Sequence, residues 1–82
     1  MNLEDIKNRL QNHFNTDKVE VFDTRGTGDH FSIIVISDKF EQQPLIKRHQ
    51  MIYNLFKNEI TKSIHALQIQ TYTKNEWKNK KI

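Results

Sequence analysis

The chain has 82 residues, no cysteine and a formal net charge of +3, which suits one small domain with a single core. Without cysteine, disulfides and any thiolate metal site built by this chain alone are excluded. No apolar run approaches the ~20 residues that span a bilayer, and the acidic start of the chain does not resemble a signal peptide. We therefore expect a cytoplasmic protein whose single domain covers residues 1–82.

The first predicted element is an amphipathic helix. Leu3, Ile6, Leu10 and Phe14 recur at helical spacing and form one apolar stripe. Asn2 precedes this stripe as a candidate cap, and acidic residues follow it in the first turn, where they favour the positive helix end.

Two strands are predicted next, over residues 19–22 and 31–36. The first alternates apolar and polar residues, which is typical of a half-buried strand, whereas the second is a dense β-branched run suited to a central position. The segment between them contains Gly26 and Gly28, the only glycines of the chain. Glycine adopts positive φ values without strain, so this segment favours a hairpin.

The second half of the chain predicts a long helix, a strand and a short terminal turn. Pro44 suits the first turn of the helix. One face of the helix is expected to contain Leu45, His49, Ile52, Tyr53, Phe56 and Ile60. A break is expected near residues 61–63, followed by a strand over residues 66–71. A helical turn over residues 76–78 would place Trp77 over the edge of the core.

These elements predict an α+β fold with the order α-β-β-α-(α)-β. A three-stranded mixed sheet with helices on one face is the economical way to bury their apolar sides. Several of the positive charges lie near the C-terminus, and we expect a flexible basic tail over residues 78–82. Such a tail can attract nucleic acid or an acidic protein, although a solvated chain end is the simpler interpretation.

An ordered set of short motifs runs along nearly the whole chain. It consists of Asp23, Gly26-Thr27-Gly28-Asp29-His30-Phe31, Ser37, Phe40, Arg48-His49, Tyr53, His65-Ala66-Leu67, Thr71-Tyr72-Thr73 and Glu76-Trp77. Each motif alone is common, but the ordered set resembles the BolA-like protein family. The resemblance implies a fold related to the type II KH architecture, which agrees with the predicted element order.

The resemblance also implies a function in iron–sulfur cluster assembly or trafficking. BolA-like proteins pair with monothiol CGFS-type glutaredoxins and share a bridging [2Fe-2S] cluster, to which the glutaredoxin brings a cysteine and a glutathione thiolate. The histidine of the His-Ala-Leu motif, His65 here, is the expected ligand from this side. A second ligand comes from the loop between the first two strands. Residues 24–29 contain neither Cys nor His, so His30 is the nearest candidate.

Each candidate ligand has a simpler alternative. His65 at a junction between elements can hydrogen-bond local backbone, and His30 can do the same in the hairpin. Imidazole ligation of an iron–sulfur cluster is nevertheless chemically sound, as Rieske centres show. We expect the isolated protein to be a monomer without cluster that forms a heterodimer with the glutaredoxin.

Three residues of the long helix, Lys47, Arg48 and His49, are candidate contacts for the partner or for nucleic acid. A local salt bridge is the alternative for Arg48, and a place at the edge of the core is the alternative for His49. The resemblance also implies a link to transcriptional and stress-related regulation, so a KH-like nucleic-acid-binding regulator is the second functional hypothesis. No glycine follows Gly28, so the Gly-x-x-Gly clamp of RNA-binding KH domains is missing. No nucleophile–base spacing stands out, and we expect no enzymatic activity.

Overall fold

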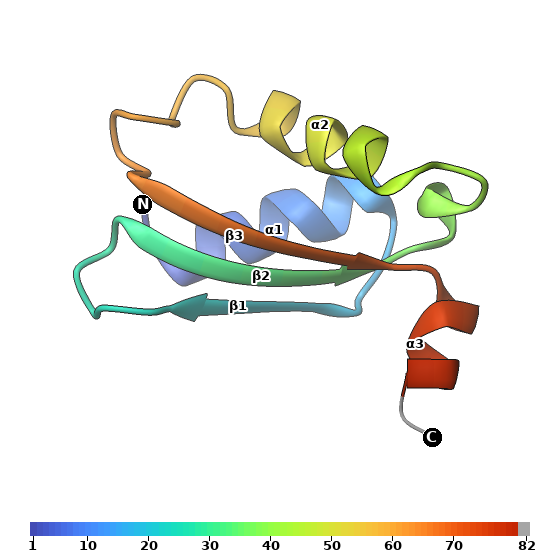
Figure 1. Ribbon diagram of the computed structural model, residues 1–82. Coiled ribbons are helices and arrows are strands. Elements are labelled where there is room, and N and C mark those ends of the chain that lie inside the picture. The colour runs from blue at the N-terminus through green and yellow to red at the C-terminus, as the bar shows by residue number, and fades with distance from the viewer. Residues whose placement is uncertain (81–82) are drawn as a thin grey trace.

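The computed structural model describes residues 1–80 and contains a three-stranded sheet with helices (Figure 1). The elements in chain order are α1 (Leu3–Phe14), β1 (Val19–Asp23), β2 (His30–Ile36), the 3-10 helix η1 (Asp38–Phe40), α2 (Leu45–Leu55), β3 (Ala66–Tyr72) and α3 (Lys74–Lys80). Over this part of the chain, no helix is long and apolar enough to cross a membrane.

The sheet has the order β1-β2-β3 and is mixed, as predicted. β1 and β2 form the expected antiparallel hairpin, and β3 runs parallel to β2 on the other side. Gly26 and Gly28 in the hairpin loop have φ values of 69° and 75°, a conformation that glycine adopts at little cost. The dense apolar strand β2 is central, which confirms the prediction from its β-branched run.

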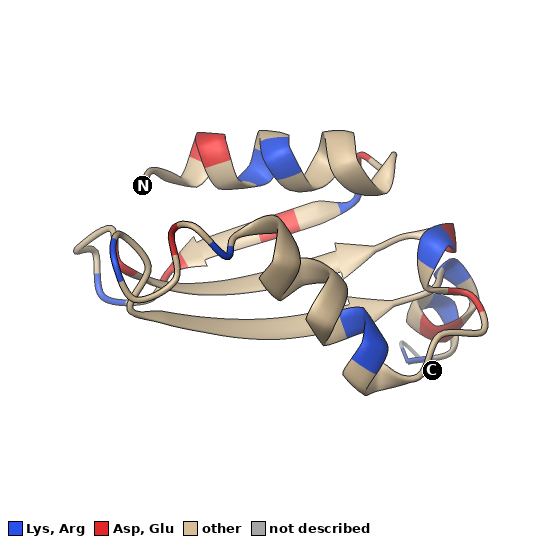
Figure 2. Cartoon of the chain, turned by 90° about the horizontal axis from the view of Figure 1, so that it is seen from above, with Lys and Arg blue, Asp and Glu red and all other residues tan. Residues whose placement is uncertain are grey.

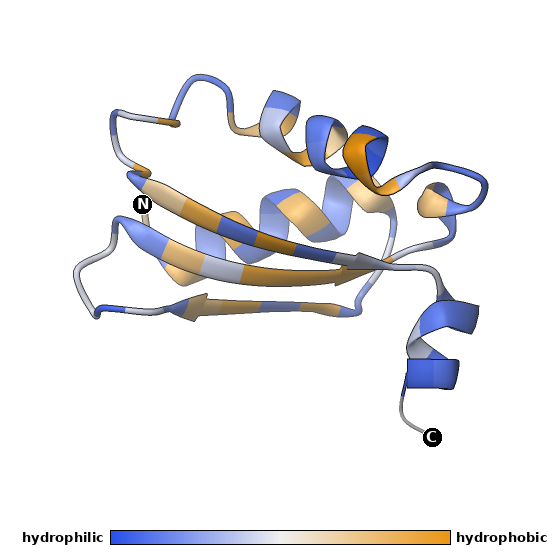
Figure 3. Cartoon of the chain, in the orientation of Figure 1, coloured by the Kyte–Doolittle hydropathy of each residue, from blue (hydrophilic) through white to orange (hydrophobic). Residues whose placement is uncertain are grey.

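α1 and α2 cover one face of the sheet and enclose the core (Figures 1 and 3). The predicted stripe of α1 is buried, and the alternating residues of β2 that face it are fully enclosed. The main buried apolar residues are Ile6, Leu10, Phe14, Phe31, Ile33, Val35, Phe40, Ile52, Phe56 and Ile64. Asn2 caps α1 as expected, because its side chain accepts a hydrogen bond of 2.9 Å from the Asp5 amide.

α2 differs from the prediction in length and in the face that it buries. The helix ends at Leu55, and a series of turns over residues 56–63 replaces both its expected last turn and the additional short helix. Thr61 in these turns has a φ of 70°. Arg48 and Ile52 are buried, whereas Leu45 and Tyr53, which were expected on the same face as Ile52, are 63% and 43% exposed.

α3 is longer than the helical turn predicted around Trp77. It includes residues 78–80 of the tail that was expected to be flexible, and residues 81–82 lie outside the described part of the chain. Trp77 packs edge-to-face on Tyr72, with ring centroids 5.2 Å apart. Together with Ile34 it lines a hollow on the face of the sheet that α1 and α2 leave open.

Candidate metal centre

The parallel pairing of β2 and β3 brings His30 and His65 together. His30 is the first residue of β2 and lies opposite Ala66, the first residue of β3. His65 directly precedes Ala66, so both histidines lie at the same end of the sheet. Their rings stack with centroids 6.1 Å apart and planes inclined by 25°. The two ligands expected from the resemblance, 35 positions apart in the sequence, are therefore neighbours.

Asp29 holds both histidines in place. Its backbone carbonyl accepts hydrogen bonds from the amides of His65 at 2.7 Å and Ala66 at 3.2 Å. One oxygen of its carboxylate lies 2.9 Å from Nδ1 of His30 and also accepts a hydrogen bond from the Thr27 hydroxyl. These bonds, from Thr27 first and His30 second, lower the pKa of Asp29 from 3.8 to about 2. The side chain is therefore an anion at neutral pH.

This arrangement suits imidazole ligation. A carboxylate that accepts the Nδ1 proton fixes the ring and leaves the Nε2 lone pair for a metal, as in many metal sites. His65 is exposed, and the side chain of His30 is 21% exposed. Within residues 1–80, no three His, Cys, Asp or Glu side chains come together as a metal site. The donor set of this site is thus two neighbouring imidazoles, a ligand type that iron–sulfur clusters accept.

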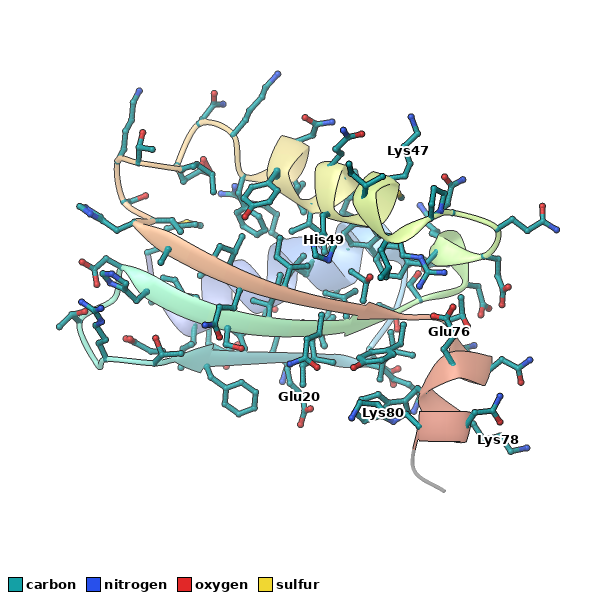
Figure 4. The ribbon with its side chains drawn as sticks, viewed as in Figure 1. Glu20, Lys47, His49, Glu76, Lys78 and Lys80 are labelled. Carbon is teal, nitrogen blue, oxygen red and sulfur yellow. The ribbon has the colours of Figure 1, made fainter. Side chains whose placement is uncertain are left out.

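The candidate contact residues on α2 lie elsewhere. α2 begins near the opposite end of the sheet from the starts of β2 and β3 (Figure 1). His49 points from α2 toward the sheet, and Lys47 points away from it (Figure 4). Lys47 is exposed and His49 is half-buried. His49 therefore lies at the edge of the core, which was the alternative to a contact role.

Arg48 forms a salt bridge within the chain, which was the alternative to a partner contact, although its partner Glu76 is distant in the sequence. Its guanidinium makes two parallel bonds to the carboxylate of Glu76 at 2.7 and 3.0 Å, and its Nε donates to the Gln43 carbonyl at 2.7 Å. The guanidinium also lies 5.7 Å from the centroid of the Phe40 ring. The side chain is only 7% exposed. The guanidinium and Nε of Arg48 are thus bonded within the chain. This geometry does not support the expected contact of Arg48 with a partner or a phosphate.

Glu76 also closes the start of α3. Its amide donates to the Thr73 hydroxyl at 3.1 Å, while its carboxylate accepts from the Thr73 amide at 2.9 Å, which is the reciprocal pattern of a capping box. The hydrogen bonds from Arg48 first, and from the Thr73 amide second, lower the pKa of Glu76 from 4.5 to about 2. Glu76 thereby fastens α3 to α2 and sets the position of Trp77.

Comparison with known proteins decides the family. The model of the family described as "BolA-like protein" matches residues 2–76. The chain belongs to the BolA-like family. A protein of Buchnera aphidicola from Acyrthosiphon pisum is 39% identical over 100% of this chain and 86% of its own length. The DNA-binding transcriptional regulator BolA of Escherichia coli is 33% identical over 90% of this chain and 77% of its own length.

Solved structures of BolA proteins share the fold. The BolA domain of SufE1 from Arabidopsis thaliana superposes with a TM-score of 0.79 at 32% identity, over 89% of this chain and 92% of that domain. BolA1 from the same plant superposes with a TM-score of 0.81 at 27% identity, over 89% and 92% of the two chains. The resemblance to the BolA-like family and the α+β fold class predicted from the sequence are thus both confirmed.

Two structural roles were absent from the sequence predictions. Asp29 belongs to the Gly-rich motif before β2, and the structure shows that it positions both candidate ligands. Its place directly before His30 is a signal that could have suggested a carboxylate–histidine pair. The Thr73-x-x-Glu76 spacing is that of a capping box, and it could have predicted the start of α3. The pairing of Glu76 with Arg48 has no local signal, because it joins residues 28 positions apart.

Proposed function

We propose that this BolA-like protein is a non-enzymatic adaptor that shares a [2Fe-2S] cluster with a monothiol glutaredoxin. His65 and His30 are the ligands from this chain, and the cysteine of the glutaredoxin and the thiolate of glutathione complete the set. The observation that carries the proposal is the stacking of the two imidazoles at one end of the sheet, with Asp29 bound to both residues.

The chemistry of the donors supports this division of ligands. Two imidazoles on one iron and two thiolates on the other make up the ligand set of Rieske centres. This chain has no cysteine, so thiolates have to come from outside. The presence of a BolA domain in SufE1 supports an iron–sulfur-related role for the family.

The test is to mix the purified protein with cluster-loaded monothiol glutaredoxin and to record visible absorption and circular dichroism. We expect the spectrum to change on mixing, because imidazole replaces other ligands. His65→Ala should abolish the change and His30→Ala should weaken or alter it. His13→Ala is the matched control, since His13 is exposed on α1. A spectrum that does not change on mixing, or that changes identically with His65→Ala, contradicts the proposal.

Nucleic-acid binding is the second candidate function. It is supported by the name of the Escherichia coli relative, a DNA-binding transcriptional regulator, and by the exposed Lys47 at the start of α2 (Figure 4). Binding of this kind should weaken steeply with salt, because it depends on phosphate contacts. Lys47→Ala should lower the affinity and the salt dependence together. Failure to bind any oligonucleotide at low salt would remove this candidate.

A further inference from the structure

β3 is an edge strand, and its free side can be assigned from the hydrogen bonds at its ends. The Ala66 amide donates to the Asp29 carbonyl, and the Tyr72 carbonyl accepts from the Ser37 amide. Both groups therefore point toward β2. Backbone groups alternate in direction along a strand, so the amides and carbonyls of Leu67 and Ile69 point away from the sheet.

This edge lacks the features that usually prevent pairing. Natural edge strands carry charges, prolines or bulges that block a further strand. β3 has the sequence Ala-Leu-Gln-Ile-Gln-Thr-Tyr, with no charge, proline or glycine. The other edge, β1, is shorter and contains Glu20 and Asp23. Figure 2 shows this contrast, because β3 is entirely tan, the colour of uncharged residues, whereas β1 contains a red, acidic position.

The helix above β3 presents apolar side chains to solvent. Leu45, Ile46 and Tyr53 are 63%, 70% and 43% exposed, and all three belong to α2, which packs against β3. Leu45 lines a hollow together with Tyr72 at the end of β3, and exposed apolar side chains of this kind favour contact with another molecule. Leu67 and Ile69 are themselves only partly buried beneath this helix.

We propose that two copies of this chain associate through their β3 edges. The strands run antiparallel around a two-fold axis at Gln68, which therefore lies opposite the partner's Gln68. Leu67 then faces the partner's Ile69, and Ala66 faces the partner's Gln70. The proposed dimer does not depend on the proposed cluster function. It differs from the sequence-based prediction, which was a monomer.

The register satisfies both the backbone and the side chains. The outward amides and carbonyls of Leu67 and Ile69 bond to those of the partner's Ile69 and Leu67, as hydrogen-bonded pairs of an antiparallel ladder do. On the helix side of the sheet, aliphatic side chains lie opposite each other. On the open side, two glutamine amides meet and no like charges oppose each other. The paired segment ends before Thr71, which is only 5% exposed and leaves no room for another strand.

The two-fold axis at Gln68 allows a sharp test by sedimentation of the apo protein from micromolar to millimolar concentration. We expect a concentration-dependent dimer. Gln68→Lys or Gln68→Glu alone should weaken it about tenfold, because each places a charge opposite its own copy. An equimolar mixture of the two variants should restore the dimer, since opposite charges then meet. Asn12→Lys on the exposed face of α1 is the matched control and should dimerise like the unchanged protein.

Amide hydrogen exchange gives an independent readout that needs no variant. The outward amides of Leu67 and Ile69 should exchange more slowly as concentration rises, whereas the amides of Gln68 and Gln70, which bond to β2, should not change. If the protein stays monomeric at millimolar concentration, the proposal is wrong, and the β3 edge is then available for pairing with a strand of another protein. A dimer that both Gln68 variants retain also overturns it. Neither measurement involves the cluster, so their failure leaves the cluster proposal untouched.

Discussion

The ion pair between Arg48 and Glu76 should be a main source of stability, and Glu76→Gln is the perturbation that tests it. The substitution keeps the length of the side chain and one carbonyl oxygen for the Thr73 amide. It replaces the second carboxylate oxygen with an NH2 group, which faces a guanidinium N–H that also donates. It also leaves the charge of Arg48, whose side chain is 7% exposed, without its counter-ion.

The size of the effect can be bracketed from the structure. The pKa of Glu76 falls from 4.5 to about 2, and at ~1.4 kcal/mol per pKa unit this corresponds to at most ~3.4 kcal/mol. Because Glu76 is 47% exposed, solvent screening reduces that figure. Exposed pairs contribute below ~1 kcal/mol and broken buried pairs cost ~3–5 kcal/mol. We expect Glu76→Gln to lower the free energy of unfolding by about 2 kcal/mol.

Thermal and urea unfolding followed by far-UV circular dichroism measure this difference. A loss of about 2 kcal/mol corresponds to a Tm lower by roughly 8–16 °C in a domain of this size. Glu20→Gln is the matched control, because Glu20 is exposed on the open face of the sheet (Figure 4), and it should change stability by less than about 0.5 kcal/mol.

The pH dependence separates the charge from other effects of the substitution. Folding lowers the pKa of Glu76, so its contribution is complete above pH 4.5, the unfolded value, and is lost as the pH falls through about 2. The gap between the protein and Glu76→Gln should therefore be full at pH 7 and close between pH 4.5 and 2. Equal Tm values at pH 7, or a gap that persists below pH 2, would show that the charge of Glu76 does not stabilise the fold in this way.

Three further substitutions follow from the packing and the backbone. Thr73→Ala should lower the free energy of unfolding in urea by about 1 kcal/mol, because it removes the hydroxyl that caps α3. An unchanged urea midpoint would argue against the cap. Ile33→Ala should cost ~2–5 kcal/mol in the same assay, since Ile33 is fully buried, whereas Phe22→Ala, at a half-exposed residue, should cost far less. Thr61→Gly should stabilise the protein by up to about 1 kcal/mol, because a β-branched residue is strained at a φ of 70°; a lower Tm would contradict this.

Elements with a strong local pattern were predicted from the sequence. The apolar stripe and Asn2 cap indicated the limits of α1, and the two glycines between an alternating run and a dense β-branched run indicated the hairpin. The end of α2 was not predictable in this way, because residues 56–60 continue the helical spacing. Tertiary contacts end the helix there instead, with Phe56 and Ile64 buried in the core and Glu59 paired with Arg9 of α1.

The residues of the candidate site could be predicted from the sequence, but their arrangement in space could not. The resemblance named His65 and His30 separately, and their proximity follows from the parallel pairing of β2 and β3, which no local pattern specifies. Arg48 lies on a predicted helix where a charged residue normally faces solvent. It is buried because its partner Glu76 arrives from α3, and such a long-range ion pair leaves no trace in helical periodicity.

The proposed function requires that imidazoles of this chain ligate the cluster, and nitrogen hyperfine spectroscopy can detect such ligation without relying on the visible spectrum. The protein is labelled with 15N-histidine, combined with unlabelled glutaredoxin, glutathione and cluster, and reduced for pulsed EPR. We expect 15N couplings from two histidine nitrogens, of which one disappears with His65→Ala and the other with His30→Ala. Reduced heterocomplex without any 15N coupling, or with couplings that survive both substitutions, would contradict it.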